Sequence, residues 1–272
     1  MNKREHIIYS IRQLIPYINW LYFYHAWQVI DSAEKKRLRQ EAEEILFQLD
    51  KTYRVHALFL LADANSDGDD LLVQGVRLPL LRQQHTDSSK PCLCLSDFVR
   101  PLSQGESDVV GVFATTVDAG MESDFRHDDY MRMMVQLLAD RLAEAAAEVM
   151  HLRVRTADWG YAPDEQLSIA DLHAEKFQGI RPAVGYPSLP DTSINFILSQ
   201  LLHFQDIGIR LTESGAMRPH ASVSGLMLAH PASRYFSVGK IGEDQLHSYA
   251  KRRGIPMELV KTFLNASLFP DK

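Results

Sequence analysis

The clearest pattern in this chain is a helical stripe of apolar side chains between Asp128 and Leu152. Apolar residues recur there every three or four positions, which is the period of one face of an α-helix. The members of the stripe are Met131, Met134, Val135, Leu138, Leu142, Ala145, Val149 and Leu152. Arg141, Glu144 and Glu148 fall about 100° away, beside the stripe instead of opposite it. The pattern therefore predicts a long helix with a charged edge along which a half-buried polar site can form.

Shorter periodic segments surround this helix. The first six residues, Met1 to His6, are followed by an amphipathic helix pattern. The N-terminal part reads as helix, turn, helix, with Asp31 and Glu34 spaced as in a capping box. Patterns typical of strands occupy His56–Leu61, Leu71–Leu78, Cys92–Asp97, Val109–Thr116, Ile209–Thr212, Ser222–His230 and Tyr235–Ile241. Further helices are expected at Ser168–Phe177, Thr192–His203, Glu243–Arg253 and Met257–Leu264.

Strands and helices are mixed without regular β-α-β alternation, which favours an α+β fold. A doubly wound methyltransferase would need a glycine-rich loop after its first strand and an acidic residue about 20 positions later, and neither is present. No linker or internal repeat divides the sequence. We therefore expect one domain over residues 1–272, with an N-terminal helical segment of roughly residues 1–54 packed on the rest.

Composition narrows the class of protein. The chain has 272 residues, of which 46% are hydrophobic, and a formal net charge of −6, which disfavours nucleic-acid binding. The aromatic segment from Leu14 to Ile30 is interrupted by polar residues and is too short to predict a membrane span. No secretory signal pattern is visible, so we expect a cytoplasmic protein. Cys92 and Cys94, two apart on an expected strand, are interpreted as buried thiols.

Neither a catalytic residue nor a metal site is predicted. The segment Asp63–Gly68 resembles the start of a calcium-binding loop, but Gln74 stands where a glutamate ligand is needed, and a β-hairpin turn explains it more simply. The eleven histidines do not cluster, and no nucleophile motif occurs.

The segment from Arg181 to Tyr186, Arg-Pro-Ala-Val-Gly-Tyr, indicates a ligand-binding loop. Arg181 can grip a carboxylate with a planar fork, Gly185 permits close backbone approach, and Tyr186 offers an aromatic wall. Pro182 makes the loop rigid. A surface turn with an incidental arginine is the other interpretation of this hexapeptide alone.

Several motifs in one order carry a family resemblance. They are Tyr17-Ile18-Asn19-Trp20, His127-Asp128-Asp129-Tyr130, Asp140-Arg141-Leu142-Ala143-Glu144, Trp159-Gly160-Tyr161-Ala162-Pro163, Gly179 to Pro187, Ala216 to Gly225 and His230 to Ile241. Together they resemble the activation domain of cobalamin-dependent methionine synthase, which binds S-adenosylmethionine (AdoMet). The resemblance implies a curved antiparallel sheet flanked by helices.

The resemblance also implies site residues. It aligns Arg181, Ala183, Gly185 and Tyr186 with the AdoMet-contacting loop and Tyr235-Phe236 with an aromatic pair near the ligand. It aligns Glu144 and Glu175 with carboxylates at the same cleft, although a solvated helix charge explains each nearly as well. Two positions depart from the family: Asn19 replaces an acidic residue, and Thr192 replaces a frequent histidine.

Two functions are compatible with this sequence. The first is a stand-alone reactivation module that binds AdoMet and supports reductive remethylation of cob(II)alamin, with the cobalamin supplied by a methionine synthase partner chain. It would use a flavodoxin- or ferredoxin-like electron donor and would be part of a methyltransferase system instead of a complete enzyme. The second is a non-catalytic AdoMet-sensing or regulatory protein of the same fold that acts on a corrinoid protein.

Overall fold

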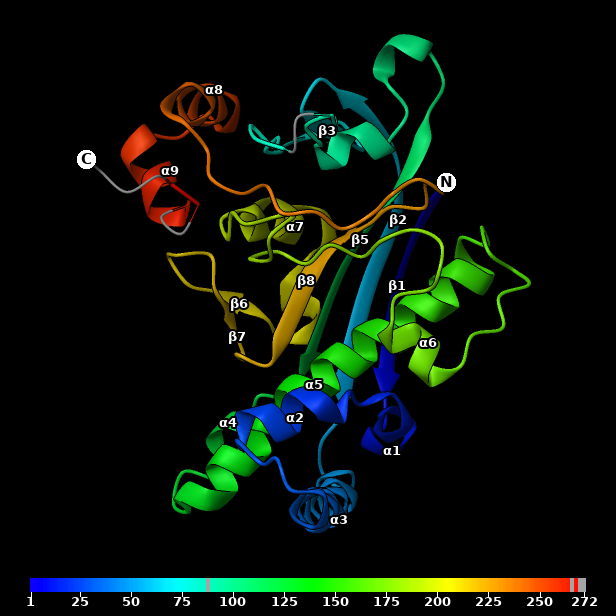
Figure 1. The fold of residues 1–272 in the computed structure, drawn as a ribbon, viewed down its shortest axis with the longest axis vertical. Helices are drawn as coiled ribbons and strands as arrows, with labels where there is room; N and C mark the ends of the chain where they lie inside the picture. Colours follow the sequence, from blue (N-terminus) through cyan, green and yellow to red (C-terminus); the bar gives the residue numbers. More distant parts are fainter. Residues whose placement is uncertain (87–88, 265–266, 269–272) are drawn as a thin grey trace.

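A six-stranded antiparallel sheet forms the centre of the protein (Figure 1). The computed structural model describes residues 1–272 apart from 87–88, 265–266 and 269–272. The strands of this sheet are β1 (Asn2–Tyr9), β2 (Val55–Asp67), β3 (Asp70–Val73), β4 (Val76–Pro79), β5 (Asp108–Val117) and β8 (Ser222–Met227). Their order is β4-β3-β2-β5-β8, and β1 pairs with the first part of β2, from Val55 to Ala62. Two short strands, β6 (Arg210–Leu211) and β7 (Met217–Arg218), form a separate pair.

The long strand β2 shows why both faces of the sheet are covered. Successive side chains of a strand point to opposite faces. Phe59 and Leu61 lie in one hydrophobic cluster, whereas Leu58 and Leu60 lie in another. A strand that is buried on both faces has an almost continuous apolar sequence, as β2 does.

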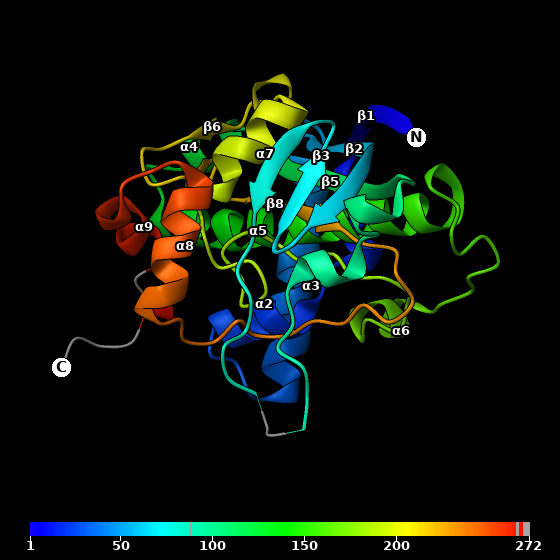
Figure 2. The same cartoon turned by 90° about the horizontal axis from the view of Figure 1, so that it is seen from above.

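Helices cover each face. Those packed on the first cluster come from the N-terminal region and from the long helix α5 (Asp129–Arg153), and the second cluster is covered by α7 (Ile194–Leu202) (Figures 1 and 2). A third cluster packs α8 (Glu243–Arg253) and α9 (Met257–Leu264) against Leu81, Val238 and Ile241. The remaining helical segments are α1 (Ile11–Leu14), α2 (Trp20–Ala26), α3 (Ser32–Leu49), α4 (Gly120–Ser123), α6 (Ile169–His173), 3-10 turns at Ile15–Tyr17, Leu95–Phe98, Leu102–Gln104 and Phe204–Ile207, and a π-helical turn at Val154–Asp158.

Three expectations about local structure are wrong. The N-terminal residues form strand β1 and not a helix, because their side chains alternate between exposed and half-buried along β2. The segment Cys92–Asp97 is a loop that ends in a 3-10 turn, since the Asp97 carboxylate accepts the Cys94 N–H at 2.8 Å. The segment Tyr235–Ile241 is extended but lies outside every strand, and its Val238 N–H donates to Pro187 O in a neighbouring loop at 2.9 Å.

Several other elements are shorter than expected, and two of them have a clear local cause. The predicted strand Leu71–Leu78 is divided into β3 and β4 by a turn in which Gln74 and Gly75 have positive φ angles. The predicted helix Ser168–Phe177 ends at His173, because Glu175 adopts a left-handed φ of 53°.

Other expectations are confirmed. Helices α8 and α9 have the predicted bounds, and the Asp31 side chain caps α3 by accepting the N–H groups of Ala33 and Glu34. Both cysteines are free thiols, but only Cys94 is buried as expected, and loss of water raises its pKa to about 11; Cys92 is partly exposed. Among the helices in the described ranges, none is long and apolar enough to cross a membrane.

Candidate functional site

The charged edge of α5 opens into a cavity of about 710 Å³. Arg141, Glu144 and Glu148 all line it, as their spacing along the helix predicts. The Arg141 Nη1 donates to Glu144 Oε2 at 2.7 Å. Loss of water raises the pKa of Glu144, and the Arg141 charge opposes that shift. The helix therefore supplies a wall of partly buried, paired charges.

A second wall is the loop that begins at Arg181. It lies against strand β8, where Ala183 forms a β-bridge with Gly225. The Val184 N–H donates to Ser224 O at 2.9 Å, and the Leu226 N–H donates to Pro182 O at 3.0 Å. Only a glycine fits at position 225, because an added Cβ would lie 2.2 Å from Pro182 O. The loop is thereby fixed to the sheet.

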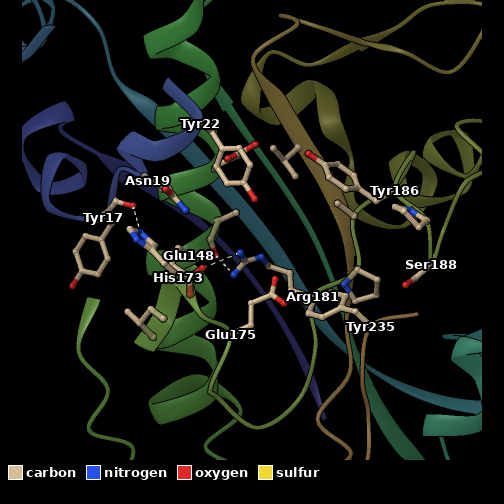
Figure 3. A pocket seen from close by; sticks show the side chains of 18 of the residues that line it. Tyr17, Asn19, Tyr22, Glu148, His173, Glu175, Arg181, Tyr186, Ser188 and Tyr235 are labelled. Carbon is tan, nitrogen blue, oxygen red and sulfur yellow. Dashed lines mark hydrogen bonds and ion pairs between the residues drawn. The ribbon is translucent and has the colours of Figure 1, made fainter. Parts of the chain in front are cut away.

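The guanidinium of Arg181 lies at the centre of the cavity (Figure 3). Only 16% of its side chain is exposed, and Nη2 donates to Glu148 Oε2 at 3.1 Å while Nη1 donates to Ala147 O at 3.1 Å. Burial is the largest single effect and lowers the pKa of Arg181, but Glu148, Tyr235 and Glu175 together outweigh it, so the pKa of Arg181 is raised. The side chain remains a cation in a fixed position.

The segment around Tyr235 lies beside the Arg181 loop and also borders the cavity. The Tyr235 hydroxyl accepts the backbone N–H of Arg181 at 2.9 Å, although the two residues are 54 positions apart. Next to it, the Phe236 N–H donates to Ser188 Oγ at 3.2 Å, and that hydroxyl donates back to Phe236 O. These bonds hold Tyr235 beside the arginine.

The third wall comes from the N-terminal helices and α6. Asn19 is the N-cap of α2, and its Oδ1 accepts the Leu21 N–H at 3.2 Å. His173 Nε2 lies 3.0 Å from Tyr17 O. Because a carbonyl oxygen only accepts, Nε2 is the donor in this contact. Glu175 follows in its left-handed conformation and also lines the cavity.

The structure brings eight of the nine predicted ligand residues to one cavity. The lining includes Asn19, Glu144, Glu175, Arg181, Ala183, Tyr186, Tyr235 and Phe236. Gly185 is outside the lining; with φ at 87° and no close neighbour except Thr192, it serves the turn of the loop and not a close approach to the cavity. Thr192 is also outside, and its hydroxyl donates to Ser214 O.

Sequence reasoning left several lining residues out of the candidate set. These are Tyr17, Tyr22, Arg141, Ala145, Ala147, Glu148, Leu172, His173, Pro182, Pro187, Ser188, Val223 and Ser237. Glu148 had a signal, since it stands four residues after Glu144 on the same helix edge. Tyr22 had none. It reaches the cavity from α2, where the Arg141 guanidinium lies 5.6 Å from the centre of its ring.

The lining favours a polar ligand that carries a positive and a negative group. Its charged residues are two arginines and three glutamates, and exposed tyrosine rings border them. Such a cavity can bind a carboxylate, a cationic group and a flat ring at once. Within the described residues, no group of three or more histidine, cysteine, aspartate or glutamate side chains is arranged to hold a metal ion.

Comparison with known families agrees with this geometry. The family model described as "Vitamin B12 dependent methionine synthase, activation domain" matches residues 10–254. The chain belongs to this activation-domain family. The resemblance inferred from the sequence motifs is thus confirmed.

A solved structure extends the comparison to three dimensions. The crystal structure of the MetH reactivation domain bound to AdoHcy (S-adenosylhomocysteine) is 37% identical in sequence and superimposes with a TM-score of 0.94. The match covers 99% of this chain and 91% of that one. The curled antiparallel sheet with flanking helices is therefore the fold of the activation-domain family, as the sequence implied.

Proposed function

We propose that this activation domain binds AdoMet and S-adenosylhomocysteine in the cavity around Arg181. The observation that carries the proposal is the fixed guanidinium of Arg181 at the centre of a cavity with both charges and aromatic walls. The related MetH reactivation domain holds S-adenosylhomocysteine in its crystal structure, which supports the same ligand class here.

Arg181 is suited to the ligand carboxylate. Its bonds to Ala147 O and Glu148 use only some of the donors of a guanidinium, and the remaining N–H groups can form a charge-assisted pair. Since the side chain is already ordered by the protein, little side-chain entropy is lost when the ligand binds.

The tyrosines are suited to the adenine. Tyr22, Tyr186 and Tyr235 all line the cavity and are 59%, 56% and 38% exposed, which leaves their rings accessible (Figure 3). Aromatic walls of this kind bind a purine by stacking or by edge contacts. Asn19, Glu144, Glu175, Ala183 and Phe236 complete the set of residues that we assign to the ligand.

The reaction that this site supports is reductive remethylation of cobalamin on a methionine synthase partner. One electron from a flavodoxin- or ferredoxin-like donor converts cob(II)alamin to cob(I)alamin, which takes the methyl group from the sulfonium of AdoMet and leaves S-adenosylhomocysteine. The sulfonium is a good leaving group, so the contribution of this chain is to hold the ligand with its methyl group toward the cobalt.

Two measurements test the proposal. Isothermal titration should show binding of AdoMet and S-adenosylhomocysteine, and absence of binding for both ligands would refute it. A reduced assay with a cob(II)alamin-loaded methionine synthase partner should show methylcobalamin formation that depends on this chain and on AdoMet. Binding without remethylation would instead support the non-catalytic AdoMet-sensing function, for which the neutral Asn19 is the favouring observation.

A further inference from the structure

Two histidines that are 50 positions apart in the sequence meet on the sheet. His6 belongs to β1 and His56 belongs to β2, and the Nε2 of His6 lies 3.1 Å from the Nδ1 of His56. Ile8 is the residue directly opposite His56, so His6 stands diagonally across the two strands. Aromatic side chains at diagonal positions of an antiparallel pair are within reach of each other. The strand pairing therefore brings two imidazole nitrogens together although the histidines do not cluster along the sequence.

Asp118 holds the ring of His56 from its other side. The Asp118 Oδ1 lies 2.9 Å from His56 Nε2, and its Oδ2 accepts the backbone N–H of Arg54 at 2.6 Å. The Asp118 N–H donates to Arg54 O at 3.1 Å, so the backbone fixes the carboxylate. Since an ionised carboxylate only accepts, Nε2 is the donor in this contact, and a neutral His56 has its lone pair on Nδ1, facing His6. Histidines that bind metal ions usually donate their other ring nitrogen to a carboxylate in this way.

The distance between the two nitrogens suits a chelate. Zinc–nitrogen bonds are about 2.0–2.1 Å long, so two of them place their nitrogens about 3.0 Å apart at a right angle and about 3.4 Å apart at the tetrahedral angle. The 3.1 Å between His6 and His56 lies within this range. A metal ion can thus replace the hydrogen bond between the rings with little movement of either strand, provided that His6 carries its hydrogen on Nδ1.

The surroundings of the pair admit a cation. His6 is exposed, and 17% of the His56 side chain is exposed. Arg4 and Asp206 both act on the charge of His6, but they form an ion pair with each other and so leave little net repulsion. Among the described residues, no third histidine, cysteine, aspartate or glutamate completes a metal site with these two. Water would therefore occupy the other coordination positions.

We propose that His6 and His56 bind a divalent transition-metal ion as a two-nitrogen chelate, with Asp118 as the positioning residue for the His56 ring. Imidazole nitrogens suit Zn²⁺, Ni²⁺ and Cu²⁺. The ion would link β1, whose strand partner is β2, to the middle of the sheet. This inference is independent of the proposed AdoMet site, and it departs from the sequence, which predicted no metal site.

Calorimetric titration with Zn²⁺ tests the chelate, after the partly exposed thiol of Cys92 has been alkylated so that it does not compete. The wild-type chain should bind one Zn²⁺ at the pair. His6→Gln and His56→Gln should each bind it at least tenfold more weakly, because loss of a ligand costs no less than the about 10–100-fold typical of losing a carboxylate behind a ligand. The two losses should not add in the double variant, since removal of one histidine already destroys a chelate. His127→Gln, which removes an exposed histidine elsewhere, should keep the wild-type affinity.

Nuclear magnetic resonance identifies the ligating atoms and the part of Asp118. In proton–nitrogen spectra of the imidazoles, Zn²⁺ should shift the signals of His6 Nε2 and His56 Nδ1, while His56 Nε2 should remain protonated. Asp118→Asn should weaken Zn²⁺ about tenfold and leave the same two nitrogens as ligands. The affinity for S-adenosylhomocysteine should be unchanged in His6→Gln, because the pair lies outside the cavity.

Each other result contradicts the inference. Absence of saturable Zn²⁺ binding by the wild type would overturn it, and so would wild-type Zn²⁺ affinity in His6→Gln, because the ion would then be held elsewhere. Since His6 is exposed on the outer strand β1, this variant decides the matter even if His56→Gln does not fold. Two bound ions, of which each single variant loses one, would show separate sites instead of a chelate. Unchanged Zn²⁺ affinity in Asp118→Asn would refute the positioning role.

Discussion

Gly225→Ala should both destabilise the protein and displace its ligand-binding loop. The added Cβ would lie 2.2 Å from Pro182 O, 2.9 Å from Ala183 Cα and 2.9 Å from the Phe113 ring. The first two contacts are with backbone atoms, which cannot rotate away as a flexible side chain can. To bring the shortest contact even to 3.0 Å, Pro182 O must retreat by 0.8 Å (3.0 − 2.2).

The expected magnitude follows from the bonds lost. A retreat of 0.8 Å along its bond would take Pro182 O from 3.0 Å to about 3.8 Å from the Leu226 nitrogen, beyond hydrogen-bond distance. The neighbouring bond from Val184 N–H to Ser224 O would be weakened as well. Two buried hydrogen bonds and the remaining overlap amount to about 2–4 kcal/mol of unfolding free energy.

Urea denaturation measures the free energy of unfolding of the variant. Titration with S-adenosylhomocysteine measures its ligand affinity, which reports whether the Arg181 loop has moved. We expect the variant to lose at least tenfold in affinity, because Arg181 belongs to the segment that moves. Gly254→Ala is the matched control: its positive φ of 66° makes alanine unfavourable, but no atom lies within 4 Å of the added Cβ. It should lose about 1 kcal/mol of stability and no affinity. Wild-type affinity in Gly225→Ala, with a stability loss below about 1 kcal/mol, would refute the reasoning.

Three other changes have defined outcomes. Arg181→Ala should weaken the binding of S-adenosylhomocysteine by about 2–4 kcal/mol in titration. It should also lower the stability in urea, because Glu148 would be left buried without its cation. Arg181→Lys should recover part of the affinity and part of the stability. Tyr235→Phe should cost about 1 kcal/mol in urea, because the Arg181 N–H loses its acceptor. Burial raises the pKa of Asp140 from 3.8 to about 6, so the stability that its ionisation costs is lost as the pH rises between these two values and is fully lost above the second. Asp140→Asn should therefore raise the unfolding free energy by about 1–2 kcal/mol at pH 8 and change it little at pH 4, whereas an equal change at both would contradict this assignment.

Local sequence predicted those parts of the fold that depend on local periodicity. The stripe of α5 and its charged edge were visible because a helix brings residues three and four apart together. Strand β1 was misread, since a short segment that alternates Lys3, Glu5 and Ile7 with other residues has no apolar face of its own. In the folded protein Glu5 pairs with Arg153 and Lys3 pairs with Asp158, about 150 residues away.

The site was predicted only in part, because local motifs are visible in a sequence but contacts between distant segments are not. Motifs identified Arg181 and Tyr235, but the hydrogen bond between them joins two loops and leaves no trace in either segment. The requirement for glycine at position 225 likewise depends on which loop lies over β8. The part of Asn19 in capping α2 could be read only once the start of that helix was known.

At position 175, the left-handed backbone conformation favours glycine for stability, whereas the cavity wall has a glutamate there. Glycine adopts that conformation without steric cost, so Glu175→Gly should make the isolated protein harder to unfold. The same change would remove the Glu175 carboxylate from the lining of the cavity. A selection for heat resistance alone would therefore favour glycine at position 175 and produce a more stable protein with a less acidic cavity.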